Sequence, residues 1–189
     1  GGGVVTDLGG FVASTYMRGI PFINIPTSLL AMVDASVGGK TGVDLGALKN
    51  LVGVINNPQG VVIYPDFLAT LPTEELRSGM AEMFKHGLIS DEAYWHKMCN
   101  LSELTEAHLG SLIYESVIIK NKVVTQDPTE KGLRKTLNYG HTLGHAIESY
   151  CLQNPNRERL LHGEAIAIGM VLATYLSVKE LGFSMDKCD

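Results

Sequence analysis

The chain has 189 residues, of which 45% are hydrophobic, so it is long enough for one domain, or one domain and part of another, with a packed core. Its net charge of −5 argues against nucleic acid and anionic membrane surfaces as partners, but not against local basic pockets for an anionic substrate. The three cysteines are far apart and form no CxxC pair, which favours a reducing, cytoplasmic compartment and no disulfide framework.

Residues 1–71 alternate short predicted elements, as in an α/β domain. The glycines at 1–3 precede a short β-branched run and look like a loop after a missing strand, so we expect part of a longer protein. A helix is predicted over 11–17, a strand over 21–26, a helix opened by Thr27 and Ser28 that continues to Ser36, and a strand over 61–64.

Residues 38–42, Gly-Gly-Lys-Thr-Gly, superficially resemble a nucleotide-binding P-loop. The first glycine of GxxxxGK[ST] is absent and no helix is predicted to follow, so we reject a nucleotide triphosphatase. The better interpretation is a glycine turn that directs Lys40 into a pocket, with Lys49 and Asn50 close behind.

From Thr73 onward, almost every segment favours helix. Helices are predicted over 73–87, 91–99, 105–125, 141–152 and 163–181. The apolar run 165–178 is too short to span a bilayer and predicts a buried core helix. We therefore expect two domains, an α/β domain over 1–71 and an all-α domain over 72–189.

Histidines gather around the start of the helix at 141. His141 and His145 are one turn apart on one face, and His162 begins another helix. Glu82 and Lys85 likewise share a helix face. A catalytic zinc site needs three protein ligands and an open position, so this pattern favours a metal site over a surface turn with a core histidine. The spacing does not choose between His141 and His145.

Nine motifs follow one another in a characteristic order. They are Gly-Gly-Gly-Val-Val-x-Asp at 1–7, Arg-Gly-Ile at 18–20, Pro-Thr-Ser-Leu-Leu at 26–30, Asp-Ala-Ser-Val-Gly-Gly-Lys at 34–40, Lys-Asn at 49–50, Ala-Glu-x-x-Lys at 81–85, Leu-Arg at 133–134, Leu-Asn-x-Gly-His-Thr-x-Gly-His-Ala-x-Glu at 137–148 and His-Gly-Glu at 162–164. Together they resemble the 3-dehydroquinate synthase family over nearly the whole chain.

The resemblance implies an incomplete Rossmann-like NAD-binding domain followed by a helical metal- and substrate-binding domain. We expect the first part of the NAD-binding domain and the last helices of the helical domain to be missing. It implies a carbon–oxygen lyase of the shikimate pathway of aromatic amino acid biosynthesis, requiring NAD and zinc or cobalt. That enzyme converts 3-deoxy-D-arabino-heptulosonate 7-phosphate to 3-dehydroquinate and phosphate. The resemblance also implies a homodimer and an anionic sugar-phosphate substrate.

The resemblance also assigns residues to roles. Glu82, His141 and His162 match metal ligands, and His145 matches a neighbour that assists the phosphate end and proton transfer. The phosphate-binding set is Arg18, Lys40, Asn50 and Asn138; Lys120 and Arg134 match the carboxylate-binding pair, and Asp34 and Lys85 the residues that hold ring hydroxyls. The NAD contacts are Gly3, Val4, Val5, Thr6, Asp7, Thr27, Ser28, Lys40, Lys49, Phe67, Leu68, Ala69 and Thr70.

Three other interpretations stay open. Another sugar-phosphate cyclase would share the metal and NAD sites and differ where the substrate carboxylate binds. A metal-dependent polyol dehydrogenase would release NADH. A catalytically silent helical domain would bind metal for interaction only, and the cationic and amide residues assigned above argue against it.

Overall fold

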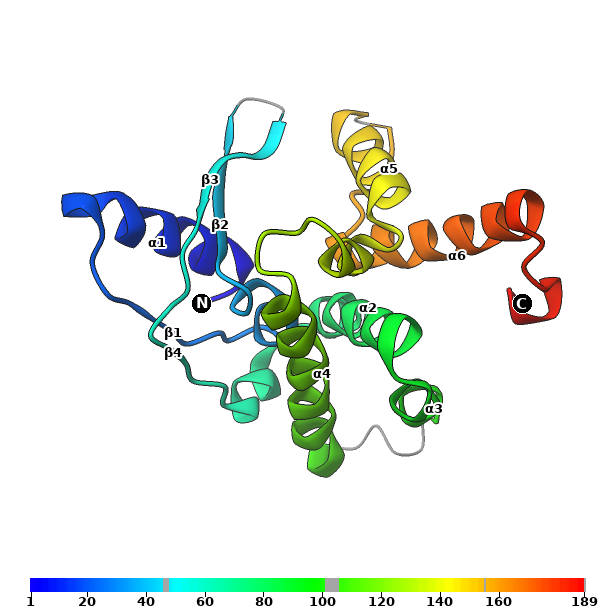
Figure 1. Cartoon of the computed structure of the whole chain (residues 1–189), viewed down its shortest axis with the longest axis horizontal. Coiled ribbons are helices and arrows are strands. Elements are labelled where there is room, and N and C mark those ends of the chain that lie inside the picture. Colours follow the sequence, from blue (N-terminus) through cyan, green and yellow to red (C-terminus); the bar gives the residue numbers. More distant parts are fainter. Residues whose placement is uncertain (46–47, 101–105, 155, 189) are drawn as a thin grey trace.

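The computed structural model describes residues 1–45, 48–100, 106–154 and 156–188. Figure 1 shows α1 and the short strands on one side and the longer helices on the other, with the N-terminus between α1 and β1 and the C-terminus beyond the end of α6. None of the described helices has the length and apolarity needed to cross a membrane.

The first element is a helix, α1 (Gly3–Thr15), rather than a loop and a β-branched run before a shorter helix. Its buried face consists of the small residues Thr6, Gly10 and Ala13, which recur at helical spacing. A Cβ on Gly10 would lie 2.6 Å from the Thr41 side chain, so the glycine lets α1 approach the hairpin that follows. The prediction failed because valines favour strands only weakly and tertiary packing overrides that preference.

A β-hairpin that the sequence analysis missed lies between the two predicted strands. β2 (Lys40–Leu45) pairs antiparallel with β3 (Leu48–Ile55), and Gly42 stands opposite Gly53. A Cβ on Gly53 would lie 2.1 Å from the Thr41 carbonyl oxygen, so the strands need this glycine. The apolar run 51–55 was the available strand signal.

The predicted strands at 21–26 and 61–64 are present only as short segments. β1 (Ile23–Asn24) pairs parallel with β4 (Gly60–Val61). The helix expected over 27–36 contains a π-helical turn, Ala31–Ala35, in which Ser36 N donates to the Ala31 carbonyl. Such turns are frequent at functional sites. A 3-10 helix, Pro65–Thr70, follows β4.

The helical half matches its prediction closely. It comprises α2 (Thr73–Ser90), α3 (Glu92–Cys99), α4 (Glu106–Gln126), α5 (His141–Gln153) and α6 (His162–Leu181), with a 3-10 helix, Leu133–Asn138, before α5. Two short 3-10 helices, Tyr16–Arg18 and Met185–Lys187, follow α1 and α6. Local signals mark the helix ends: the Asp91 carboxylate accepts from Tyr94 N, and Gly182 adopts a left-handed φ of 69° after α6.

One hydrophobic core joins the two halves. Leu29, Met32 and Val33, from the segment around the π-helical turn, pack against Met83 of α2 and Tyr94 of α3, all fully or almost fully buried. The π-helical turn is thereby held against the helical half, which positions Asp34 next to α2 and α4.

Helix α6 is only partly the buried core helix that its composition predicted. Its first half is buried at Ala165, Ile166 and Met170, but Val171 is 60% exposed and Leu176 is 48% exposed. Figure 1 shows the second half of α6 running outward beyond α2 and α5. The prediction was wrong there because an apolar helix is buried only where other elements cover it, and in the described part of the chain they cover one end.

Glycines bring the backbone of α6 into direct contact with its neighbours. A Cβ on Gly163 would lie 1.9 Å from the Ser78 carbonyl oxygen of α2, and a Cβ on Gly169 would lie 2.1 Å from the Gly140 carbonyl oxygen before α5. Gly163 N also donates to Ser78 Oγ at 2.9 Å. These contacts place the first half of α6 beside both α2 and the start of α5.

Candidate active site

A cavity of about 850 Å³ lies between the two halves. It is lined by α1, the hairpin, the π-helical turn and helices α2, α4, α5 and α6. The residues expected at the site that line it are Gly3, Val4, Asp7, Asp34, Lys40, Asn50, Lys85, Lys120, Arg134, Asn138, His141, His145 and His162. Residues far apart in sequence therefore meet at one place.

Other residues expected at the site do not line this cavity. They are Arg18, Val5, Thr6, Thr27, Ser28, Phe67, Leu68, Ala69, Thr70 and the metal-ligand candidate Glu82, which lies beside the cavity. Leu68 belongs to the hydrophobic core, and the Thr6 hydroxyl donates to the Gly3 carbonyl within α1. The side chain of Lys49 lies outside the described part of the chain. The assignment of Arg18 to the phosphate, and of Val5, Thr6, Thr27, Ser28, Lys49 and residues 67–70 to NAD, stays a prediction.

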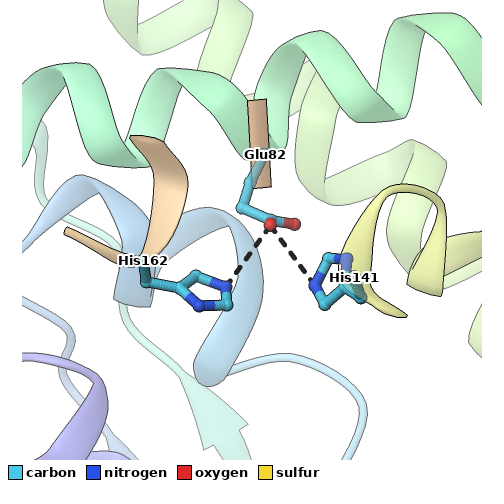
Figure 2. Close-up of side chains that lie close together, drawn as sticks. All are labelled: Glu82, His141 and His162. Carbon is cyan, nitrogen blue, oxygen red and sulfur yellow. Dashed lines mark ion pairs between the residues drawn. The ribbon is translucent and has the colours of Figure 1, made fainter. Parts of the chain in front are cut away.

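Glu82, His141 and His162 converge beside the cavity. Figure 2 shows the Glu82 carboxylate of α2 between the two imidazoles, which come from the first residues of α5 and α6. Glu82 Oε1 lies 3.6 Å from His141 Nε2 and 3.7 Å from His162 Nε2. Two ligand atoms on one tetrahedral zinc ion are roughly 3.4 Å apart, because each bond is about 2.1 Å long. The spacing therefore fits a shared ion.

The Glu82 carboxylate is completely buried, and only one of its two oxygens has a hydrogen-bond partner among the described residues. Its Oε2 accepts from Lys85 Nζ, whereas Oε1 has no hydrogen-bond partner among the described residues. Burial by itself raises the pKa of Glu82, but the Lys85 ammonium together with the contacts to His162 and His141 outweighs it and holds the pKa below its usual range. A buried, ionised oxygen without a partner costs about 1–3 kcal/mol or more, so a cation at Oε1 would stabilise the site.

The two imidazoles differ in their surroundings. His141 Nδ1 lies 3.2 Å from the Tyr139 carbonyl oxygen, an acceptor that fixes the proton on Nδ1 and leaves Nε2 free to face Glu82. Burial lowers the pKa of His141. Burial also lowers the pKa of His162, but its contact with Glu82 outweighs this and the net shift is upward. The lowered pKa favours the neutral form of His141, which is the form that binds a metal ion.

Two further groups of ligand-type side chains overlap this one. Asp34, Glu82 and His86 have ligand atoms within 4.8 Å of one another. Asp34 in that group is already neutralised by Lys120, which contacts both its carboxylate and its carbonyl oxygen, so a further cation beside it would be repelled. His145, Glu148 and His162 form the other group, in which His145 is 47% exposed at its side chain. Glu82 with His141 and His162 is therefore the best-formed candidate.

Asp34 and Lys120 form a buried ion pair at the cavity wall. Lys120 Nζ lies 2.5 Å from both Asp34 Oδ1 and the Asp34 carbonyl oxygen. Burial raises the pKa of Asp34, but the Lys120 and Lys85 charges outweigh it and hold the pKa well below its usual range. Burial raises the pKa of nearby Asp7 to about 6, with Asp34 adding to the shift. Lys120, expected to bind a substrate carboxylate, thus already neutralises Asp34.

Arg134 is buried and holds two segments of the chain together. Its Nη1 donates to the Pro128 carbonyl at 2.9 Å and its Nη2 to the Gly38 carbonyl at 2.7 Å. Each of these nitrogens carries a second N–H, so the guanidinium retains donors for an anion in the cavity that it lines. Its orientation is fixed before any ligand binds.

Glu130 is a site residue that the sequence analysis did not identify. It forms an ion pair with Lys40 and accepts from Asn138 Nδ2 at 2.5 Å, and its backbone has a left-handed φ of 59°. Both partners belong to the expected phosphate-binding set. Glu130 thus holds the start of β2 against the helical half. The sequence signal was slight, because Glu130 is one of two acids in the turn 127–130.

Comparison with solved structures defines the class of fold. A 2-epi-5-epi-valiolone synthase from Streptomyces hygroscopicus, with NAD+ and Zn2+ bound, is 31% identical with a TM-score of 0.84, covering 99% of this chain and 52% of that one. A 2-deoxy-scyllo-inosose synthase complexed with carbaglucose-6-phosphate, NAD+ and Co2+ is 31% identical with a TM-score of 0.86, covering 99% and 51%. The fold is therefore that of the sugar-phosphate cyclases.

Family models match both halves of the chain: 3-dehydroquinate synthase N-terminal matches residues 1–78, and 3-dehydroquinate synthase C-terminal matches residues 79–188. The chain belongs to the 3-dehydroquinate synthase family, which confirms the resemblance found in its motifs. The 3-dehydroquinate synthase of Parabacteroides distasonis is 50% identical over 189 residues, which cover 99% of this chain and 53% of that protein. The one from Streptococcus gordonii is 49% identical over 183 residues, covering 95% and 50%. The chain thus spans about half the length of the curated relatives it matches.

Proposed function

We propose that this chain carries the metal site and much of the substrate site of a 3-dehydroquinate synthase, which converts 3-deoxy-D-arabino-heptulosonate 7-phosphate to 3-dehydroquinate and phosphate. The observation that carries the proposal is the convergence of Glu82, His141 and His162 beside a cavity lined with cations. The proposal is also supported by membership of the family and by a sequence identity of 49–50% with curated 3-dehydroquinate synthases.

The reaction comprises oxidation of a ring hydroxyl by NAD, loss of phosphate, re-reduction, ring opening and aldol closure, with NAD regenerated in each turnover. A zinc or cobalt ion held by Glu82, His141 and His162 would acidify the hydroxyl and polarise the resulting ketone. NAD and the divalent metal bound by the solved neighbours are consistent with this cofactor pair.

The side chains around the cavity have separate tasks in this proposal. Lys40, Asn50 and Asn138 hold the phosphate, and release from Glu130 frees Lys40 and Asn138 for that anion. Arg134 holds the carboxylate with the donors that its backbone contacts leave unused, and Lys120 adds positive charge beside it. Asp34 and Lys85 hold ring hydroxyls, and His145, half exposed at the cavity, moves protons.

The remaining parts of the proposal concern the whole protein. We assign it to the cytoplasm, as a homodimer acting on a small anionic sugar phosphate without nucleic acid or membrane partners. The absence of CxxC pairs supports the cytoplasm and the net charge of −5 supports the lack of nucleic acid and membrane partners, whereas the homodimer rests on the family resemblance alone.

The function is tested by phosphate release from 3-deoxy-D-arabino-heptulosonate 7-phosphate, with and without NAD and Co2+. We expect release only when both are present, with no accumulation of NADH. Accumulating NADH without phosphate release would instead indicate a polyol dehydrogenase. Faster turnover of a sugar phosphate that lacks a carboxylate would indicate another cyclase, the class of the two solved neighbours.

Replacing Arg134 with alanine is expected to weaken substrate binding by about 2–5 kcal/mol, because a charge-assisted pair with the substrate carboxylate is lost in a closed site. Binding of NAD should change much less. Isothermal titration with each ligand separates the two effects. Lys135→Ala is the matched control, since Lys135 is the adjacent cation and is exposed. An unchanged substrate affinity in Arg134→Ala would remove Arg134 from the carboxylate site.

A further inference from the structure

Glu148 lines the same cavity as His141 and His162, and no role has been assigned to it above. It lies on α5, two turns after His141, and its side chain is 11% exposed. Its Oε2 is 3.3 Å from His145 Nδ1 and 3.8 Å from His162 Nδ1. One carboxylate oxygen thus faces two imidazoles that come from different helices.

His162 therefore lies between two carboxylates. Its Nε2 faces Glu82 Oε1 at 3.7 Å and its Nδ1 faces Glu148 Oε2 at 3.8 Å. A neutral imidazole carries one proton, and a metal ligand must present its bare nitrogen to the ion. The nitrogen that faces Glu148 is the one that has to keep the proton.

His141 already has an acceptor for its Nδ1 proton, the Tyr139 carbonyl oxygen at 3.2 Å. For His162, Glu148 Oε2 is the acceptor that the structure places on the Nδ1 side. The separation of 3.8 Å is an ion-pair distance, longer than a hydrogen bond. The two candidate ligands thus have analogous supports, one from the backbone and one from Glu148.

We propose that Glu148 is a positioning residue of this site. Its Oε2 accepts a hydrogen bond from Nδ1–H of His162, so that the bare Nε2 of His162 faces Glu82. The same oxygen orients His145. The inference rests on the proposed metal site. It links the ligand His162 to the proton carrier His145, because a change in Glu148 moves both imidazoles at once.

Glu148 acts through the histidines and is not itself a ligand in this proposal. The ligand atoms of Glu82, His141 and His162 lie within 4.8 Å of one another, and Glu148 belongs to a different group, with His145 and His162. Acceptors that support metal-bound histidines typically contribute about 10- to 100-fold to metal affinity. Loss of a ligand costs more, so the size of the effect distinguishes the two roles.

The test measures Co2+ affinity of the purified protein by competition with a chelator, together with the visible absorption spectrum of bound Co2+. Glu148→Gln keeps the shape and one acceptor oxygen but removes the charge; we expect affinity to fall by about 10- to 100-fold, with an altered spectrum. Glu148→Ala should lose more than Glu148→Gln. The matched control is Glu180→Gln, an exposed position near the end of α6, which should leave affinity and spectrum unchanged.

Three other outcomes would overturn the proposed role of Glu148. An unchanged affinity and spectrum in Glu148→Gln would show that His162 needs no support from Glu148. A loss as large as that of His162→Ala would make Glu148 a ligand. If the unaltered protein binds no Co2+, the metal site fails and the role of Glu148 fails with it. Co2+ binding with the expected losses, but no phosphate release from the heptulosonate phosphate, would refute the proposed enzyme and leave the role of Glu148 intact.

Discussion

Replacing His162 with alanine is expected to lower the affinity of the protein for Co2+ or Zn2+ by more than about 100-fold. This exceeds the loss of about 10- to 100-fold that follows when a residue supporting a metal ligand is replaced. The reason is geometric: His162 Nε2 and His141 Nε2 face the same unpartnered oxygen of Glu82, so the variant keeps two of three ligands. Chelator competition measures the affinity. Phosphate release from the heptulosonate phosphate should fall in parallel.

His96→Ala is the matched control for this variant. His96 is also a helix histidine near an acid, Glu92, but its side chain is 70% exposed and it does not line the cavity. Metal affinity should therefore be unchanged. A crystal structure with an ion bound by His141 and His145 together, without Glu82, would show that the ligand assignment is wrong.

Replacing Gly163 with alanine is expected to destabilise the protein, although alanine ordinarily favours a helix. The added Cβ would lie 1.9 Å from the Ser78 carbonyl oxygen, so α6 has to move away from α2. Overpacking of this kind costs about 1–3 kcal/mol, which corresponds to several degrees in melting temperature for a chain of this size. Co2+ affinity should fall too, because Gly163 follows His162 and the shift takes His162 away from Glu82.

The control is Gly9→Ala in α1, where an added Cβ meets nothing within 4 Å. No contact there opposes the preference for alanine over glycine in a helix, so the free energy of unfolding should rise by about 0.5–1 kcal/mol. Thermal unfolding followed by circular dichroism compares the two variants. If Gly163→Ala were as stable as Gly9→Ala, the close backbone contact between α2 and α6 would be refuted.

Sequence alone determined the helical half of the fold and the family. The helices from 73 onward were predicted within a few residues, because their signals are local: apolar spacing, a capping acid such as Asp91 and a terminating glycine such as Gly182. The motif order identified the 3-dehydroquinate synthase family, and the resemblance named Glu82, His141 and His162 together. Local spacing predicted that a site exists around 141–148.

Tertiary structure decided what depends on contacts between distant segments. His141 and His145 are equivalent by helical spacing, and only the position of α2 brings Glu82 next to His141. The hairpin of β2 and β3 depends on strand pairing across Gly42 and Gly53.

The roles of individual side chains were decided in the same way. Exposure of the second half of α6 depends on what packs against it, which composition does not record. The contacts of Glu130 with Lys40 and of Glu148 with His162 join different elements, brought together by packing. Local patterns determine helices because backbone hydrogen bonds in a helix join residues four apart. Glu82 is 59 positions from His141 and 80 positions from His162 in the sequence, so their site exists only once α5 and α6 have packed on α2.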